Sequence, residues 1–337
     1  MSDVLTYPIA TGRLVLSQGE LVALAEEVGA ERVRGLDGWG LLHAGVDPAA
    51  ARAALEARGL DRSRADLLGA AAAWVRQRLA LLRLDEAGQR AALILRHEAD
   101  RLVSHLVAAG PAAGHSGAVG VAVSTVFDQP VAAGPLTTLA PRELVVEELD
   151  PAELTDRAWR ATGLDEEPGG GPADDGDTAD AGEAPDTGDA AAGDAAAGEA
   201  DAAEAGARAL LPRPFVAGLR DAVQESAADA TDRLVAAGLA AADASALVDE
   251  LATGPLPLVR LVAWRRTGGG DDAGVTAAGG ADDGGDGVSE VRATWLVGRD
   301  RLWLVSEAPG VDVVGLGPDT VAGAARTVAA AVGEGER

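Results

Sequence analysis

Histidine is the side chain that most often carries acid–base or metal chemistry near neutral pH. The four in this sequence are His43, His97, His105 and His115. His97 and His105 lie near expected strands, but a pair of histidines without a close third ligand is weak evidence for a metal site. Cysteine is absent, which excludes disulfides, thiolate metal sites and a cysteine nucleophile. A histidine without partner ligands is more commonly a surface or hydrogen-bonded residue than a ligand, so we expect no metal site.

Other catalytic motifs are incomplete. Ser116 stands in a Gly-His-Ser-Gly run, but a nucleophile elbow needs glycine two residues after the serine, where this sequence has Ala118. The acidic run 281–287 lacks the ligand spacing and the distal glutamate of a calcium loop. All 28 basic residues are arginine, which excludes a Walker A lysine, a Schiff-base lysine and a Ser-Lys dyad. We therefore expect a protein that is not an enzyme and holds no cofactor.

Carboxylates keep one enzymatic alternative open. Outside the two strongly acidic segments the chain has 35 acidic residues, and nothing in their spacing selects a pair for acid–base work. The alternative hypothesis is a hydrolase-like enzyme of unknown class that uses carboxylates or His115.

Three of the six tryptophans fall on one expected run of strands. Trp264 lies on the first strand, and Trp295 and Trp303 flank the turn 298–300. Two interpretations are open: tryptophans on a sheet can fill the core beneath it, or they can form an exposed platform, since tryptophan is enriched at interface hot spots. We take Trp295 and Trp303 as the candidate partner-binding residues.

The net charge of −26 is concentrated in two segments. Residues 165–207 hold 14 acids and residues 267–287 hold 5, with no basic residue in either. The rest of the chain has a net charge of −7. A chain this acidic repels phosphate backbones, so we expect no nucleic-acid partner.

One group of arginines defines a DNA-binding alternative. Arg52, Arg58, Arg62 and Arg64 lie close together, but acidic residues are interleaved with them. This mixture favours a solvated helix surface with salt bridges.

The acidic segment also divides the chain. It is built of Gly, Ala, Asp, Glu, Pro and Thr without large apolar residues, so it cannot bury enough surface to become ordered. We expect an N-terminal half at 1–164, a disordered acidic linker at 165–208 and a C-terminal half at 209–337 with a disordered loop at 267–287.

Helix and strand patterns follow the same order in both halves. In the first half, caps and apolar periodicity predict helices at 17–28, 47–59, 62–78 and 150–161, and short apolar runs predict strands at 79–84, 91–97, 102–106 and 119–127. In the second half the expected helices are 214–238, 242–251 and 318–332, and the expected strands are 258–265, 291–297, 302–306 and 311–316. The predicted fold class is α+β, with two similar halves that each combine helices and a small antiparallel sheet. This order indicates a possible internal duplication.

The first ten residues and the lengths of the apolar runs indicate where in the cell the protein is expected. Residues 1–10 lack the charged-then-apolar pattern of a signal peptide, and no run of about 18 uncharged apolar residues occurs. We expect no membrane span and a cytoplasmic protein.

Three segments carry a resemblance to a known family. They are residues 14–24 (LVLSQGELVAL), residues 50–60 (AARAALEARGL), and residues 295–306 (WLVGRDRLWLVS) followed by the strand from 311 and the last helix. Together they resemble the EspG-type chaperones of actinobacterial type VII secretion. The resemblance implies two related α+β halves about a central antiparallel sheet, and a cytoplasmic chaperone or adaptor that binds a secreted helical-hairpin client of the PE/PPE kind.

Overall fold

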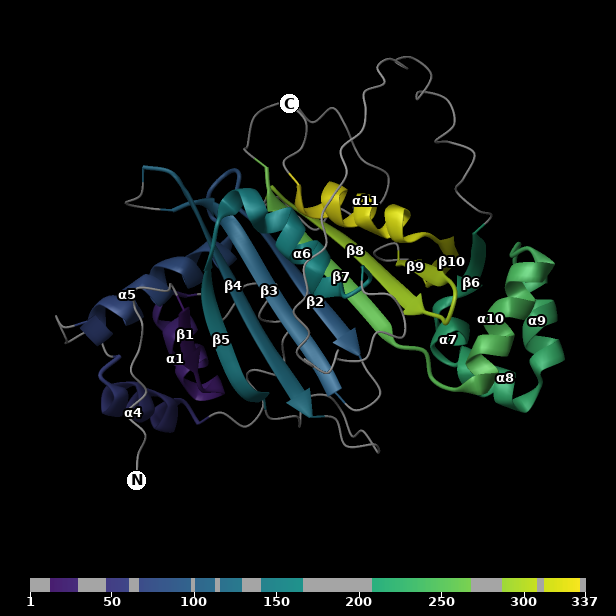
Figure 1. The fold of residues 1–337 in the computed structure, drawn as a ribbon, viewed down its shortest axis with the longest axis horizontal. Helices are drawn as coiled ribbons and strands as arrows, with labels where there is room; N and C mark the ends of the chain where they lie inside the picture. Colours follow the sequence, from purple (N-terminus) through teal and green to yellow (C-terminus); the bar gives the residue numbers. More distant parts are fainter. Residues whose placement is uncertain are drawn as a thin grey trace, which may run out of the picture.

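One antiparallel sheet runs through the molecule (Figure 1). The computed structural model describes residues 13–29, 47–60, 67–97, 101–112, 116–128, 141–165, 208–267, 287–307 and 312–333. The sheet has ten strands in the order β1-β5-β4-β3-β2-β7-β8-β9-β10-β6. The strands are β1 (Arg13–Leu16), β2 (Arg90–His97), β3 (Arg101–Pro111), β4 (Ala118–Asp128), β5 (Pro141–Leu149), β6 (Ala209–Pro212), β7 (Leu258–Arg266), β8 (Val288–Val297), β9 (Leu302–Glu307) and β10 (Val313–Asp319).

Helices precede and follow the strands of each half. They are α1 (Gln18–Glu27), α4 (Pro48–Arg58), α5 (Leu67–Leu79), α6 (Leu154–Thr162), α7 (Arg213–Ala217), α8 (Leu219–Glu225), α9 (Ala227–Ala236), α10 (Ala241–Thr253) and α11 (Val321–Val332), with 3-10 turns η3 (Ala80–Arg83) and η5 (Pro151–Glu153). The α+β class expected from the sequence is confirmed.

The sheet is one structure and not two small ones, which corrects the expectation of a separate sheet in each half. Strands β2 and β7 pair along their length, from Arg90 opposite Arg265 to His97 opposite Leu258. This seam joins the strands that precede the acidic segment to those that follow it. Read from its two edges, the sheet runs β1-β5-β4-β3-β2 and β6-β10-β9-β8-β7. In each run, the strand that comes first in the sequence (β1 or β6) lies at the edge of the sheet and pairs with the strand that comes last (β5 or β10).

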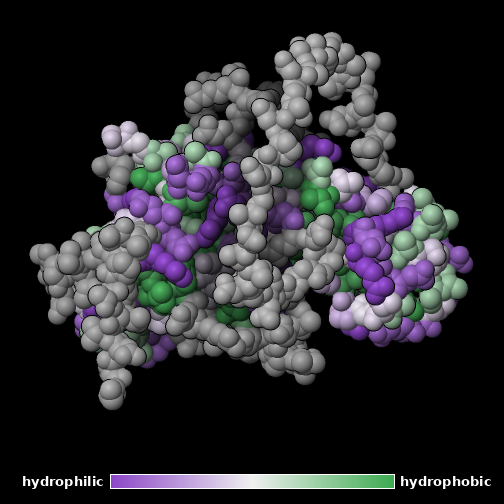
Figure 2. All heavy atoms as spheres, in the orientation of Figure 1, coloured by the Kyte–Doolittle hydropathy of each residue, from purple (hydrophilic) through white to green (hydrophobic). Residues whose placement is uncertain are grey.

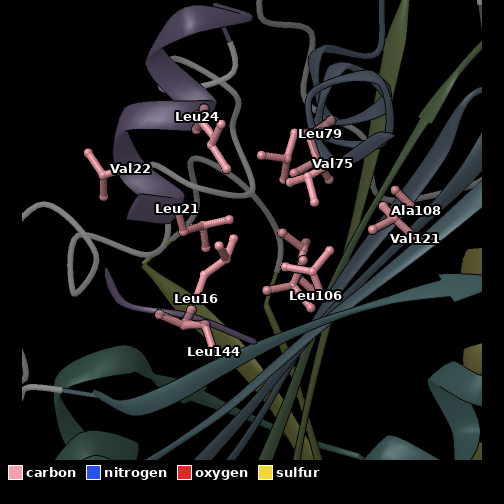
Figure 3. Packing of buried hydrophobic residues seen from close by; sticks show 14 of the residues in the cluster. Leu16, Leu21, Val22, Leu24, Val75, Leu79, Leu106, Ala108, Val121 and Leu144 are labelled. Atoms are coloured by element: carbon pink, nitrogen blue, oxygen red, sulfur yellow. The ribbon is translucent and has the colours of Figure 1, made fainter. Parts of the chain in front are cut away.

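Helices of both halves cover one face of the sheet, which we call the bundle face. In the first half, α1, α4 and α5 enclose a core with the inward side chains of β2 to β5. Figure 3 shows Leu21 and Leu24 of α1 and Leu79 of α5 directed toward Leu106 and Leu144 of the sheet. In the second half, α8, α9 and α10 pack on β6, β9 and β10.

The opposite face, which we call the helix-pair face, carries α6 and α11. These two helices contact each other and lie across the central strands (Figure 1). Their apolar sides include Leu154 and Ala158 of α6 and Ala324 and Val328 of α11, all buried against the sheet. Because alternate residues of a strand face opposite sides, the central strands are apolar on both faces.

The expected helix signals act as predicted. The hydroxyl of Ser17 accepts from the backbone N–H of Glu20, and the Glu20 side chain accepts from the N–H of Ser17, which completes the capping box. Asp47 caps α4, and Gly59 ends it in the left-handed conformation.

Three local predictions were wrong. Residues 79–84 were expected to form a strand. They instead contain the last residue of α5 and the 3-10 turn η3. The single helix expected at 214–238 is divided into α7, α8 and α9, with breaks at Gly218 and Ser226. Strands β5 and β6 were not predicted, and they are held in the sheet by pairing with β4, which lies across a long connection from β5, and with β10, which lies far from β6 in the chain. The centres of the acidic linker and of the loop 267–287 lie outside the described residues.

Candidate functional site

Both predicted partner-binding tryptophans lie in the core. Trp295 and Trp303 each have 0% exposed surface. Trp295 lies on the helix-pair face among residues packed under α11, and Trp303 lies on the bundle face against α10. Their indole groups are also satisfied internally, since Trp295 Nε1 donates to Asp319 Oδ2 at 2.9 Å and Trp303 Nε1 donates to Glu250 Oε2 at 3.0 Å.

This placement matches the core interpretation of the tryptophans and does not provide an exposed platform. The two residues lie on adjacent strands but point to opposite faces, because Leu296, and not Trp295, stands opposite Trp303. A partner could reach their side chains only after α10 or α11 moved. Their role as contacts therefore has no support from the geometry.

A different surface presents exposed apolar side chains. Among the described residues, five large apolar side chains are exposed, and two of them lie on the neighbouring strands β6 and β10 at one end of the sheet. They are Leu210 (69% exposed) and Val313 (38%). On the coloured part of the face in Figure 2, several groups of hydrophobic residues lie between hydrophilic ones.

The register of β6 and β10 brings these side chains together. Leu210 is opposite Gly315, and Pro212, also exposed, is opposite Val313. Leu210 and Val313 therefore share the helix-pair face, and Leu210 has no cross-strand side chain beside it because its neighbour is glycine. We call Leu210, Pro212 and Val313 the β6 patch.

The outer edge of β6 is closed to a further strand. The N–H of Leu210 donates to the carbonyl of Ala237 at 3.2 Å. Two residues on, Pro212 has no N–H to offer. Alternate residues direct their backbone groups to the same side of a strand, so both outward donor positions are removed. The β6 patch thus suits contact through side chains, as with the apolar face of a helix, and not strand addition.

The described histidines are poorly suited to proton chemistry near neutral pH. Burial, together with the positive charges of the neighbouring Arg96 and Arg157, lowers the pKa of His105 to about 4. Burial and Arg260 likewise lower the pKa of His97. Both are neutral at pH 7. His43 and His115 lie outside the described residues.

A small polar cavity lies between β5 and α6. Its volume is about 190 Å³, less than the 300–1,000 Å³ or so of a usual small-molecule site. Its charges are compensated, because Glu147 pairs with Arg13 at 3.4 Å and with Arg157 at 2.6 Å. We assign no ligand to it.

The arginines of the DNA-binding alternative are engaged within the fold. Arg58 donates to Glu20 and to the carbonyl of Val15, and Arg52 pairs with Glu26 at 3.4 Å. Arg62 and Arg64 lie outside the described residues. Among the residues that the structure describes, no group of three or more histidine or acidic side chains could hold a metal ion, and no helix is long and apolar enough to cross a membrane.

Comparison with known proteins gives a likeness in structure but none in sequence. No family model matches the chain, and no curated protein matches it in sequence. The fold is similar to the structure of the Mycobacterium tuberculosis type VII secretion system chaperone EspG5 in complex with the PE25–PPE41 dimer. The likeness has a TM-score of 0.44 and 12% sequence identity, and covers 96% of this chain and 98% of that chain.

Proposed function

We propose that this protein is a chaperone or adaptor that binds another protein through the β6 patch. The observation that carries the proposal is the gathering of exposed apolar side chains at one end of the sheet, with Leu210 at 69% exposure. Exposed apolar groups that adjoin one another favour association, because burial of a leucine or valine contributes about 1.5–3 kcal/mol.

The chemistry of the β6 patch favours a helical partner. Its side chains are aliphatic, and the edge beside them is closed to strand addition by Pro212 and by the bond from Leu210 to Ala237. An amphipathic helix can place an apolar stripe on such a surface.

The client class follows the sequence resemblance. We propose a secreted helical protein of the PE/PPE kind, bound in the cytoplasm before export through a type VII secretion system. In this role the protein would cover the apolar helix face of its client until delivery. It requires no cofactor and no chemical step.

We also propose that the chain consists of two similar halves, 1–164 and 209–337, joined by the acidic linker 165–208. The support is the matching strand order from the two edges of the sheet. Each half also ends in a helix on the helix-pair face, α6 or α11.

The test is affinity capture from the native cytoplasm with the full chain as bait, followed by mass spectrometry. We expect a small, helical, secreted protein in near-equal amount. The double variant L210E/V313E should lose it, with an affinity at least about 100-fold weaker, because two apolar contacts worth about 3 kcal/mol together are removed.

A matched control is V291E, which makes the same change at an exposed valine of β8, away from β6. It should capture the client as the wild type does. Equal capture by wild type and L210E/V313E, or recovery of no such protein, would contradict the proposal. Unchanged thermal unfolding of L210E/V313E shows that its fold is intact.

A further inference from the structure

Strand β8 has an edge that no described strand covers. It pairs with β7 along its whole length, from Val288 to Leu296 opposite Arg266 to Leu258. Its pairing with β9 on the other side begins only at Thr294, opposite Val305. Residues 288–293 are therefore paired on one side alone within the described part of the chain.

The gap arises from a difference between the two halves. In the first half, the corresponding strand β3 pairs with β4 from Arg101 to Pro111 without interruption. In the second half, β9 is short and ends at Glu307. Its last residues pair with β10 and not with β8, so the two strands separate beyond Val305.

The hairpin register shows which backbone groups face this gap. Gly298 N–H donates to Arg301 O at 2.9 Å, and Val297 N–H donates to Pro257 O at 2.8 Å on the other side. Even-numbered residues of β8 therefore direct their N–H and C=O groups toward β9. By the same alternation, Val288, Glu290 and Arg292 present theirs at the open edge.

The side chains at this edge place one acidic and one basic residue on either side of an apolar one, in the order Glu290, Val291, Arg292. Glu290 and Arg292 lie on the bundle face and contact each other, with side-chain exposures of 23% and 41%. Between them Val291 points to the helix-pair face and is 42% exposed. The sequence Glu-Val-Arg thus places opposite charges two residues apart about an exposed valine.

The other two edges of the sheet differ from this one. At β6, Pro212 and the bond from Leu210 to Ala237 close the edge. At the other end, β1 has four residues, and short edge strands pair weakly with other chains. Residues 288–293 contain no proline and form the longer open edge.

We propose that β8 pairs with β8 of a second copy of this chain, antiparallel, to form a symmetric dimer. With Val291 opposite Val291 of the other copy, Glu290 of each copy lies opposite Arg292 of the other. The outward backbone N–H and C=O groups of Glu290 and Arg292 then form hydrogen bonds with those of Arg292 and Glu290 in the other copy. Two opposite-charge cross-strand pairs form at the same time, and one patch serves both copies, as a twofold interface requires.

The first test measures the mass of the full chain by sedimentation equilibrium over a range of concentrations. The wild type should dimerise, while E290R and R292E should each be monomeric, because like charges then face each other. An equimolar mixture of the two variants should dimerise again, since the arginines of E290R face the carboxylates of R292E. A monomeric wild type, or a mixture that stays monomeric, would overturn the proposal.

The second test uses the absence of cysteine from the chain. In a non-hydrogen-bonded antiparallel pair the Cα atoms are about 4.5 Å apart, which a disulfide can span. V291C should form a disulfide-linked dimer under mild oxidation, and V313C, at an exposed valine of β10, should not. Equal cross-linking of both variants would overturn the register.

The dimer and the proposed client site can be tested separately. L210E/V313E should keep the wild-type dimer, and V291K should abolish it without affecting the β6 patch. V291K also covers the case in which E290R does not fold, because Val291 is exposed whereas Glu290 accepts from Trp264 Nε1 at 3.0 Å. A V291K variant that folds and remains dimeric contradicts the proposal.

Discussion

Arg90 of β2 and Arg265 of β7 stand directly opposite each other, and both donate to the C-terminal end of α11. Arg90 Nη1 reaches the carbonyl of Val332 at 3.2 Å, and Arg265 Nη2 reaches that of Gly333. Like charges opposite each other normally destabilise a sheet. Here the last carbonyls of a helix, which carry partial negative charge, accept both arginines. The seam between the two parts of the sheet thus holds the closing helix.

Removal of this pair should loosen α11. R90M/R265M keeps the aliphatic stems but removes both donors, and we expect a loss of about 2–4 kcal/mol in the free energy of unfolding. Urea denaturation measures it, and hydrogen exchange should increase first in the last turn of α11. The control R326A, at an exposed position of the same helix, should change stability by less than about 0.5 kcal/mol.

The buried tryptophans should contribute to stability. W295A and W303A should each lower the free energy of unfolding by about 3–5 kcal/mol, because a large buried side chain is lost and a cavity forms. V235A, an exposed change, should leave it within about 0.5 kcal/mol. If either tryptophan variant kept full stability but lost client capture, the residue would be a contact and not a core side chain.

The acceptor of Trp303 can be tested on its own. E250L leaves the buried indole N–H without its partner, which should cost about 1–3 kcal/mol. E250Q keeps an acceptor and should cost less. Chemical denaturation of both variants decides the point, and equal losses would show that the carboxylate charge matters more than the hydrogen bond.

Glu20 combines a capping box with an ion pair. It is 2% exposed, and burial raises its pKa against the lowering effect of the hydrogen bonds with Ser17. E20A removes the cap and the contact with Arg58, and we expect a loss of about 2–3 kcal/mol. E20Q can keep the capping box and should lose about half as much in the same denaturation experiment.

Stability should fall as the pH is lowered through the range set by His105. Its folded-state pKa is about 4, compared with 6.5 for an unperturbed histidine. The unfolded chain therefore takes up this proton first, and the stability that the neutral form provides is lost progressively from about pH 6.5 to pH 4. H105Q should have a flatter stability curve over this range by up to about 3 kcal/mol. An unchanged curve would show that His105 is not buried in the native state.

Local signals in the sequence determined much of the secondary structure. The capping box at Ser17, the left-handed glycine after α4 and the turn at 298–300 depend on residues that are neighbours in the chain. These contacts form within a few residues, so their residue types are sufficient to predict them. The same signals predicted the α+β class.

The tertiary structure decided what the chain alone left open. The sequence offered Trp295 and Trp303 either to the core or to a partner, and burial under α11 and α10 placed both in the core. The sequence did not predict that Leu210 is exposed, because its exposure depends on Gly315, which lies opposite it and more than 100 residues later in the chain. The open edge of β8 likewise depends on where β9 ends its pairing. The sequence by itself determined most of the helices and the strands that have clear local signals. The joining of the sheet at β2 and β7, and the surfaces that it leaves exposed, were decided by long-range pairing, because such contacts join residues far apart in the chain.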